Sequence, residues 1–258
     1  MLRLVLKTLT VIIISILAFS NSIIAGPKPT HKNIKYSDTH KRNKLDVWIP
    51  KSKTPTPLIV YFHGGSFKHG DKSHFYNRSI LSINLGKGVA FASVNYPFIK
   101  DIGILEILAN TTASIKFLKS KSKEWNIDPN KIAVMGTSAG AIIAEYLTYW
   151  AKDLKITGCY GEQQPYRSWF LLTAFAKNDP PLILYTRSGL KDKVHHPKHA
   201  KTFKTHCDNI GIQCELYGSK TSGLPQLPTG INIEKKVMQF FTKQWNQPKA
   251  ITKKKTKD

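Results

Sequence analysis

Short apolar runs alternate with segments of helical spacing along most of the chain. Continuous apolar runs, typical of buried parallel strands, predict strands at 58–62, 88–94, 132–135 and 181–185, and flanking runs add strands at 45–49 and 213–217. Apolar residues at helical spacing predict helices at 104–118, 139–150, 200–210 and 233–245. Strands that alternate with helices predict an α/β fold, with a mostly parallel sheet covered on both faces. Ligands of such sheets bind at the carboxyl ends of the strands.

The two ends of the chain differ from this pattern. Arg3 and Lys7 precede an apolar run at 9–19 and a group of small residues that ends at Ala25, which predicts a signal peptide over 1–25. An uncleaved anchor is the alternative, but the apolar run is short for a membrane span. We therefore expect export to a periplasmic or extracellular location. We interpret 26–44 as a linker and N-terminal extension, 45–246 as the folded domain and 247–258 as a basic disordered tail.

Charge is the most unusual bulk property. The 258 residues include 39 Lys and Arg against 16 Asp and Glu, a formal net charge of +23. Such a field favours anionic neighbours, although a solvated lysine surface is the simpler interpretation. No recognition helix or aromatic-basic motif is visible, so no specific nucleic acid is expected as a partner. We expect a monomer. Three cysteines form no disulfide framework, and pairing of Cys207 with Cys214 stays open.

A sharp turn is predicted between the strand at 132–135 and the helix that follows it. Gly136-Thr137-Ser138-Ala139-Gly140 fits the pattern G-x-S-x-G, in which small residues let the backbone turn tightly and lift the serine above the sheet. The alternative is a chance serine turn, but the strand-turn-helix context favours a nucleophile. Ser138 is therefore the predicted nucleophile, with the Ala139 N–H free to donate.

A second glycine-rich loop follows the strand at 58–62. It begins His63-Gly64-Gly65-Ser66, and such glycines let backbone N–H groups point at a carbonyl oxygen that becomes negative in the transition state. We predict an oxyanion loop at Gly64, Gly65 and Ser66, whose donors act together with Ala139. His63 is interpreted as a structural residue of this loop.

These motifs resemble those of a known family. The run at 61–72, YFHGGSFKHGDK, is similar to the HGG-x-[WF]-x-x-GDK segment of the bacterial esterase/lipase branch of α/β hydrolases, which includes feruloyl-esterase-like and acetyl-esterase-like proteins. Segments 89–96 and 126–132 and the Gly136 turn follow in the family's order. The resemblance implies the α/β-hydrolase fold. The segment 160–179 between two predicted strands is short, so any cap over the pocket must be small or built partly from the N-terminus. The resemblance also implies hydrolysis of carboxylic esters, small or linked to polysaccharide, through an acyl-enzyme without metal or cofactor.

The family's order also implies the acid of a catalytic triad. Asp192, in the loop after the strand at 181–185, matches the acid by position, although a solvated loop aspartate is the alternative. The family places its histidine in the loop after the last strand. Here that loop is GSKTSGLP at 218–225, Ser222 stands near the expected position, and no histidine follows His206.

Three explanations of the missing base stay open. The first is a catalytically dead protein that binds ligands or serves as a scaffold of the cell envelope. The second is a relocated base, His195 or His196, although both could simply be surface histidines. The third is a Ser–Lys arrangement with Lys220, which requires a buried lysine. The predicted function is a serine esterase acting through Ser138, with its efficiency open. A basic protein that only adsorbs anionic polymers is a further alternative.

Overall fold

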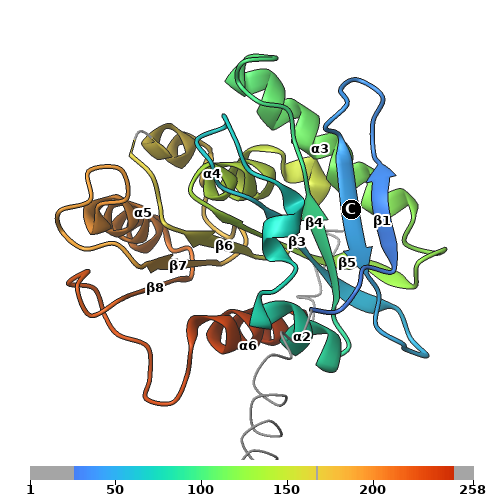
Figure 1. Ribbon diagram of the computed structural model, residues 1–258. Helices are drawn as coiled ribbons and strands as arrows, with labels where there is room; N and C mark the ends of the chain where they lie inside the picture. The colour runs from blue at the N-terminus through green and yellow to red at the C-terminus, as the bar shows by residue number, and fades with distance from the viewer. Residues whose placement is uncertain (1–25, 167, 247–258) are drawn as a thin grey trace, which may run out of the picture.

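One eight-stranded sheet runs through the computed structural model, which describes residues 26–166 and 168–246 (Figure 1). Its strands are β1 (His31–Lys35), β2 (Lys44–Trp48), β3 (Thr56–Phe62), β4 (Ala90–Val94), β5 (Ile127–Thr137), β6 (Cys159–Glu162), β7 (Leu182–Thr186) and β8 (Cys214–Gly218). They lie in the order β1-β2-β4-β3-β5-β6-β7-β8. The strands from β4 to β8 pair in parallel, and β1 and β2 add an antiparallel edge. The mostly parallel α/β fold expected from the sequence is confirmed.

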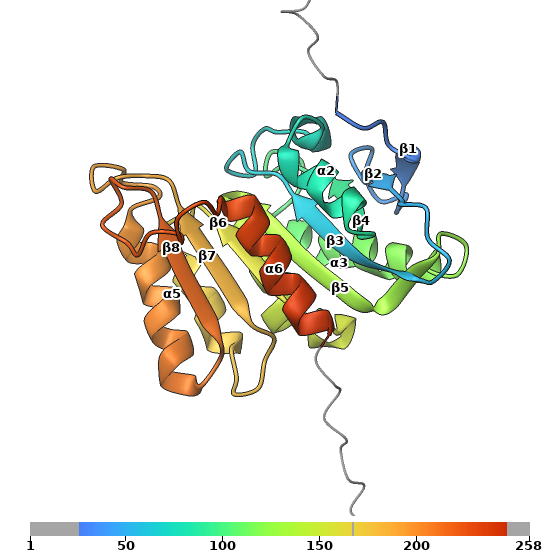
Figure 2. The same ribbon diagram turned by 90° about the horizontal axis from the view of Figure 1, so that it is seen from below.

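Helices cover both faces of this sheet. The α-helices are α2 (Ser79–Gly86), α3 (Ile104–Ser120), α4 (Ala139–Glu145), α5 (Pro197–Ile210) and α6 (Ile233–Trp245). Shorter turns of helix are η1 (Lys72–Phe75), η2 (Tyr146–Trp150), η3 (Lys152–Leu154) and η4 (Ser168–Ala174). Figure 2 shows α2 and α6 side by side on one face, whereas α3 and α4 lie behind the sheet with α5.

Each face of the sheet has its own hydrophobic core, because successive side chains of a strand point to opposite faces. On β3, Leu58, Val60 and Phe62 join the core under α3, α4 and α5. Ile59 and Tyr61 join the core under α2 and α6. All of these side chains are buried. This two-sided burial explains why the strand reads as a continuous apolar run.

The structure adds elements that the pattern did not predict. Residues 26–44, expected as a linker and extension, contribute β1, which pairs with β2 as the edge strand. β1 carries mostly polar side chains, so it gave no apolar run. β6 is only four residues long and contains Gly161, and α2 ends at a glycine. The helix expected over 139–150 is α4 followed by the π-helical turn η2.

The ends and the cysteines complete the comparison. The predicted signal peptide at 1–25 and the predicted tail at 247–258 lie outside the described residues. Across residues 26–166 and 168–246, none of the helices combines the length and the apolarity needed to cross a bilayer. Cys159, Cys207 and Cys214 are all buried and carry free thiols, so the structure contains no Cys207–Cys214 disulfide.

Candidate active site

Ser138 stands on a strained turn between β5 and α4. Its φ is 56° and its ψ is −117°, a conformation that non-glycine residues rarely adopt. The Ser138 N–H donates to the Glu162 carbonyl at the end of β6, 2.8 Å away. The Glu162 carboxylate, which is buried, also accepts a hydrogen bond of 2.7 Å from the Thr137 hydroxyl. β6 therefore holds the turn in place from its neighbouring position in the sheet.

Glycines make this turn possible. A Cβ atom on Gly136 would lie 2.0 Å from the Gly140 carbonyl oxygen, and one on Gly140 would lie 2.0 Å from the Phe62 carbonyl oxygen. Both distances are far too short for a carbon atom, so only glycine fits at either position. The predicted reason for the G-x-S-x-G spacing is thus visible as close approach of backbone to backbone.

The glycine-rich loop after β3 lies against the same turn. A Cβ on Gly64 would lie 3.4 Å from Ser138 Cβ and 2.8 Å from the Thr137 carbonyl oxygen. Gly65, Ser66 and Phe67 all have positive φ, at 114°, 54° and 59°, so the loop reverses sharply. Ser66 and Ala139 line the same cavity as Ser138. The structure thus brings the predicted oxyanion residues to the nucleophile.

Polar side chains anchor this loop to the sheet. Asp71 accepts hydrogen bonds from the Asn95 side-chain amide at 2.7 Å and from the Ser73 N–H at 2.9 Å. The Lys72 ammonium lies 2.6 Å from the Asp46 carboxylate of β2, and both side chains are buried. The Gly-Asp-Lys segment therefore fixes the end of the loop rather than the reacting atoms.

His63 supports the loop from below. Its ring is buried, stacks on Tyr96 with centroids 4.3 Å apart, and its Nδ1 lies 2.7 Å from the Gly64 carbonyl oxygen. Burial lowers the pKa of His63 to about 4, so the ring is neutral near pH 7. This geometry fits the structural role expected from the sequence.

His195 is the histidine that reaches Ser138. Its Nε2 lies 2.9 Å from Ser138 Oγ, although the two residues are far apart in the sequence. His195 belongs to the loop between β7 and α5, whereas the relatives implied by the sequence carry this histidine after the last strand. Of the residues that the sequence offered as a relocated base, His195 is thus the one that contacts the serine.

Asp192 completes the contact from the same loop. Its Oδ2 lies 3.4 Å from His195 Nδ1, and its Oδ1 accepts hydrogen bonds from the N–H groups of His195 and Val194 at 2.9 and 2.8 Å. Hydrogen bonds from the His195 N–H and the Ser188 hydroxyl lower the pKa of Asp192 to about 2. The carboxylate is therefore ionised at neutral pH and faces the nitrogen of His195 remote from Ser138.

The other candidate bases point elsewhere. His196 accepts a hydrogen bond of 3.0 Å from the Lys198 N–H and is the N-cap of α5. Lys220 is exposed in the loop after β8, so it does not meet the burial that a Ser–Lys site requires. Ser222 is buried, and its hydroxyl donates to the Ser219 carbonyl at 2.6 Å. The position expected for the family's histidine is thus filled by a serine that closes its own loop.

A large part of the folded chain resembles a known protein family. The BD-FAE family model matches residues 45–174, about half of the chain. The chain belongs to the BD-FAE family. The match includes the glycine-rich loop and Ser138 and ends before Asp192 and His195, so the part of the site that departs from the expected arrangement lies beyond it.

Curated relatives of this BD-FAE chain are esterases. A probable isoprenylcysteine α-carbonyl methylesterase, ICMEL1 of Arabidopsis thaliana, is 31% identical over 115 residues, 44% of this chain and 23% of the relative. Fumonisin B1 esterase of Sphingopyxis macrogoltabida is 29% identical over 119 residues, 38% of this chain and 21% of that protein. The chain thus spans less than a third of the length of the first relatives that it matches.

Solved structures support the fold. A truncated carbohydrate esterase from gut microbiota has a TM-score of 0.71 at 17% identity, covering 86% of this chain and all of that one (100%). Esterase 2 of Thermogutta terrifontis, solved phosphoramylated by tabun, has a TM-score of 0.64 at 17% identity, covering 84% and 93% of the two chains. The BD-FAE chain therefore has the α/β-hydrolase fold.

Two residues of the BD-FAE chain that sequence reasoning missed hold Asp192 in place. The Ser188 hydroxyl donates to Asp192 Oδ2 at 2.6 Å and accepts from the Gln163 side-chain amide at 2.7 Å. Gln163 also accepts from the Arg187 N–H at 2.6 Å. Gln163 follows β6, so its contact with the loop after β7 depends on the sheet and left no signal in the sequence. Ser188 was visible in the acid loop, but its role was not.

A cavity of about 400 Å³ opens onto Ser138. Its walls come from the oxyanion loop, the starts of α3 and α4, the segment at η4 and the loop that carries His195. They are formed by Ser66, Phe67, Lys68, Ile104, Ser138, Ala139, Ile142, Pro165, Tyr166, Phe170 and Val194. Most of these side chains are apolar, and Lys68 is the charged one. The cavity suits an apolar group next to the nucleophile.

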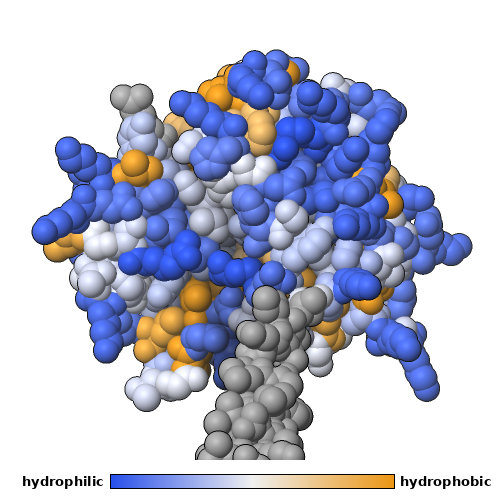
Figure 3. Space-filling view, viewed as in Figure 1, coloured by the Kyte–Doolittle hydropathy of each residue, from blue (hydrophilic) through white to orange (hydrophobic). Residues whose placement is uncertain are grey.

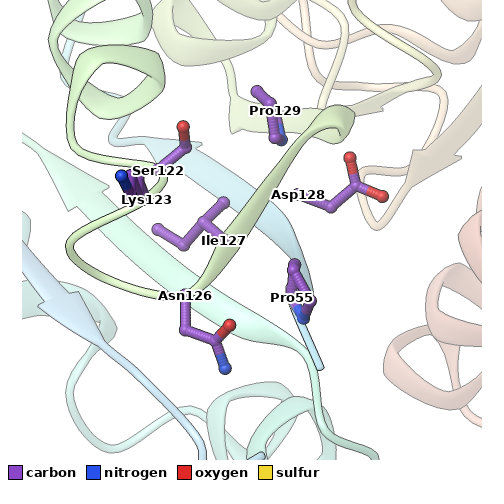
Figure 4. Close-up of a pocket in the computed structure, with 7 residues that line it drawn as sticks. All are labelled: Pro55, Ser122, Lys123, Asn126, Ile127, Asp128 and Pro129. Atoms are coloured by element: carbon purple, nitrogen blue, oxygen red, sulfur yellow. The ribbon is translucent and has the colours of Figure 1, made fainter. Parts of the chain in front are cut away.

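A larger hollow of about 550 Å³ lies at the opposite ends of the strands, near the starts of β3 and β5 (Figure 4). Its polar side chains are used locally. Asp128 accepts a hydrogen bond of 2.9 Å from the Asn130 N–H, and the Asn126 amide donates to the Ser52 and Thr54 carbonyls at 3.0 and 3.1 Å. This hollow therefore offers no comparable chemistry. Among the described residues, no group of three or more His, Cys, Asp or Glu side chains could hold a metal ion.

Proposed function

We propose that this BD-FAE chain is a carboxylic-ester hydrolase in which Ser138 is the nucleophile, His195 the general base and Asp192 the residue that orients it. The observation that carries the proposal is the 2.9 Å distance between Ser138 Oγ and His195 Nε2. Asp192 stands on the other side of the same ring. A serine, a base within hydrogen-bond reach and an acid behind the base are the arrangement that activates a hydroxyl.

The reaction proceeds in two halves. Ser138 Oγ attacks the ester carbonyl while His195 Nε2 takes its proton, and the negative oxygen is held by the N–H groups of Gly65, Ser66 and Ala139. The C–O bond to the alcohol then breaks, and the alcohol leaves with the proton from His195. Water attacks the acyl-enzyme with His195 again as the base, and the acid product leaves Ser138 with its proton restored. Asp192 stays ionised and stabilises the charged imidazole throughout.

The substrate is an ester with an apolar group next to the carbonyl, either a small molecule or one linked to a polysaccharide. Support comes from the mostly apolar walls of the cavity and from the esterases among the relatives. The segment between β6 and β7 forms only the short η4, so the cap over the site is small. We further propose export to the periplasm or the medium, which rests on the sequence of residues 1–25.

The second candidate is a binding protein of the cell envelope that has lost catalysis. It is favoured by one observation, the buried Ser222 at the position where the family carries its histidine. The two candidates differ in the reactivity of Ser138, because a binding protein needs no activated hydroxyl.

Labelling with a fluorophosphonate probe tests the proposal. The probe reacts with an activated serine, so we expect a stable adduct on Ser138 and none in the Ser138→Ala variant. A matched control is Ser66→Ala, which removes the other serine hydroxyl of the cavity and leaves labelling in place. Folded wild-type protein that takes up no probe and hydrolyses no short-chain ester would contradict the proposal and favour the binding protein.

A further inference from the structure

Exposed apolar side chains gather around the mouth of the Ser138 cavity. Seven large apolar side chains are exposed in the described residues. Five of them belong to segments that line this cavity, and a sixth, Ile99, donates its N–H to the carbonyl of the wall residue Phe67. We call these six the apolar rim: Ile99, Leu105, Tyr166, Trp169, Leu190 and Val194. The seventh is Trp150, at the far end of η2. Isolated apolar side chains on a surface need no explanation, but a group around one opening marks an interaction site.

Several members of the rim are neighbours in the sequence of residues that form the cavity wall. Leu105, 72% exposed, follows the wall residue Ile104 in the first turn of α3. Trp169, 64% exposed, directly precedes the wall residue Phe170. Leu190, also 64% exposed, lies in the loop that carries Asp192. Figure 3 shows hydrophobic colour over the start of α3 and a second patch at the lower left, on a face that is hydrophilic over most of its area.

Lysines stand beside the apolar rim. Lys68 lines the cavity, and Lys100, Lys191 and Lys193 are exposed neighbours of rim residues in the sequence. None of the ion pairs found within residues 26–166 and 168–246 involves these four lysines. The charge of this opening is therefore available to an anionic partner.

Two of the three nearby acidic groups already face titratable partners. Asp192 contacts His195, and the Asp101 carboxylate lies 3.5 Å from His40 Nε2. Glu106 is the remaining acidic side chain of the first turn of α3. Positive charge therefore predominates around the apolar rim.

We propose that the apolar rim docks the protein on an anionic lipid surface, with the mouth of the Ser138 cavity facing the lipid. Apolar side chains that enter the interface, flanked by lysines that pair with anionic headgroups, are the features by which proteins bind such surfaces. A polysaccharide is the other large partner to consider, but it is recognised by aromatic platforms. Four of the six rim residues are aliphatic: Ile99, Leu105, Leu190 and Val194.

This docking would present esters of the lipid phase to Ser138. That part of the inference rests on the proposed esterase function, whereas the docking itself does not. The two are therefore tested separately, docking with protein that carries Ser138→Ala and catalysis with a water-soluble ester.

Vesicle binding provides the test. Protein that begins at Gly26 and carries Ser138→Ala is mixed with two kinds of vesicle. One contains phosphatidylcholine alone, and the other also contains the anionic lipid phosphatidylglycerol. The bound fraction is measured by flotation. The rim variant carries Leu105→Ser and Trp169→Ser, and the control carries Trp150→Ser, a tryptophan outside the rim that is 51% exposed. We expect binding to the anionic vesicles, weakened about tenfold or more in the rim variant and unchanged in the control.

Equal binding of the rim variant and the Trp150 control would overturn the docking surface, since adsorption would then come from the basic exterior as a whole. Absence of binding to anionic vesicles would overturn it as well. The docking proposal would also be overturned if the rim variant lost its retention on an insoluble polysaccharide while its vesicle binding stayed intact. When Ser138 is retained, the rim variant should hydrolyse a short-chain soluble ester at the wild-type rate. Failure of the wild-type protein on that ester would count against the esterase and leave the vesicle result standing.

Discussion

His195 Nδ1 and Asp192 Oδ2 lie 3.4 Å apart on one loop, with only two residues between them in the sequence. The same Asp192 carboxylate accepts the His195 N–H at 2.9 Å, so it fixes both the backbone and the ring of the histidine. The proposed acid and base therefore belong to one loop, between β7 and α5. The loop after β8, where the resemblance led us to expect the histidine, closes on itself through the hydrogen bond from Ser222 to the Ser219 carbonyl.

Replacing each of the two adjacent histidines by alanine distinguishes the base from its neighbour. His195→Ala should lower kcat for ester hydrolysis on the order of a million-fold, as loss of the base does in related chemistry. His196→Ala should leave kcat within a few-fold and cost about 1 kcal/mol of stability, because it removes the N-cap of α5. Steady-state kinetics and urea unfolding of both variants measure this. Similar losses of kcat in the two would argue against His195 as the base.

Ser188 is expected to position Asp192 rather than to touch the substrate. Ser188→Ala removes a hydrogen bond that lowers the pKa of Asp192, so that pKa should rise from about 2 toward its ordinary value. We expect kcat to fall about tenfold with KM unchanged, because binding is untouched. Ser188→Thr keeps the hydroxyl and should restore both values. Carboxyl NMR titration reports the pKa, and an unchanged Asp192 titration in Ser188→Ala would contradict the role.

Complete burial gives β3 a clear sequence signal, whereas β6 is also buried but is only four residues long and contains a glycine, so it gave none. β3 is buried on both faces and appears as an unbroken apolar run, and the glycines at 136 and 140 are needed by backbone contacts that no other residue permits. β1 gave no signal because an edge strand keeps polar side chains in solvent. The 2.9 Å contact between His195 and Ser138 could not be predicted as more than one option. It depends on the path of an irregular loop, and spacing along the chain does not determine that path.

Acid should destabilise the protein through His63. Burial lowers the pKa of His63 to about 4 in the folded state, against an unfolded value near 6.5. Between these values the unfolded chain binds a proton that the folded chain does not. Stability is therefore complete above the unfolded pKa, falls as the pH drops toward 4, and loses about 3 kcal/mol from this group by then.

The pH window separates this effect from that of Asp71. Asp71, whose pKa is lowered to about 2 in the presence of hydrogen bonds from Asn95 and Ser73, loses its contribution only at lower pH. Urea unfolding at pH 7 and pH 5 should show a smaller difference in His63→Asn than in the wild type. Burial also lowers the pKa of His199, which adds a slope of the same sign in both proteins. An equal pH dependence in the two would rule out His63 as a source.

Gly140 should tolerate no side chain, whereas Gly86 should. A Cβ on Gly140 would lie 2.0 Å from the Phe62 carbonyl oxygen and 2.8 Å from that of His63, so Gly140→Ala must push α4 away from β3. We expect a loss of about 3 kcal/mol or more in the free energy of unfolding. Any protein that still folds should lose fluorophosphonate labelling, because Ser138 is the N-cap of α4. Gly86, at the end of α2, has no heavy atom within 4 Å of its Cβ position. Gly86→Ala should change the stability by less than about 1 kcal/mol and leave labelling intact. Wild-type stability and labelling in Gly140→Ala would show that the close approach of the serine turn to β3 is not needed for the site.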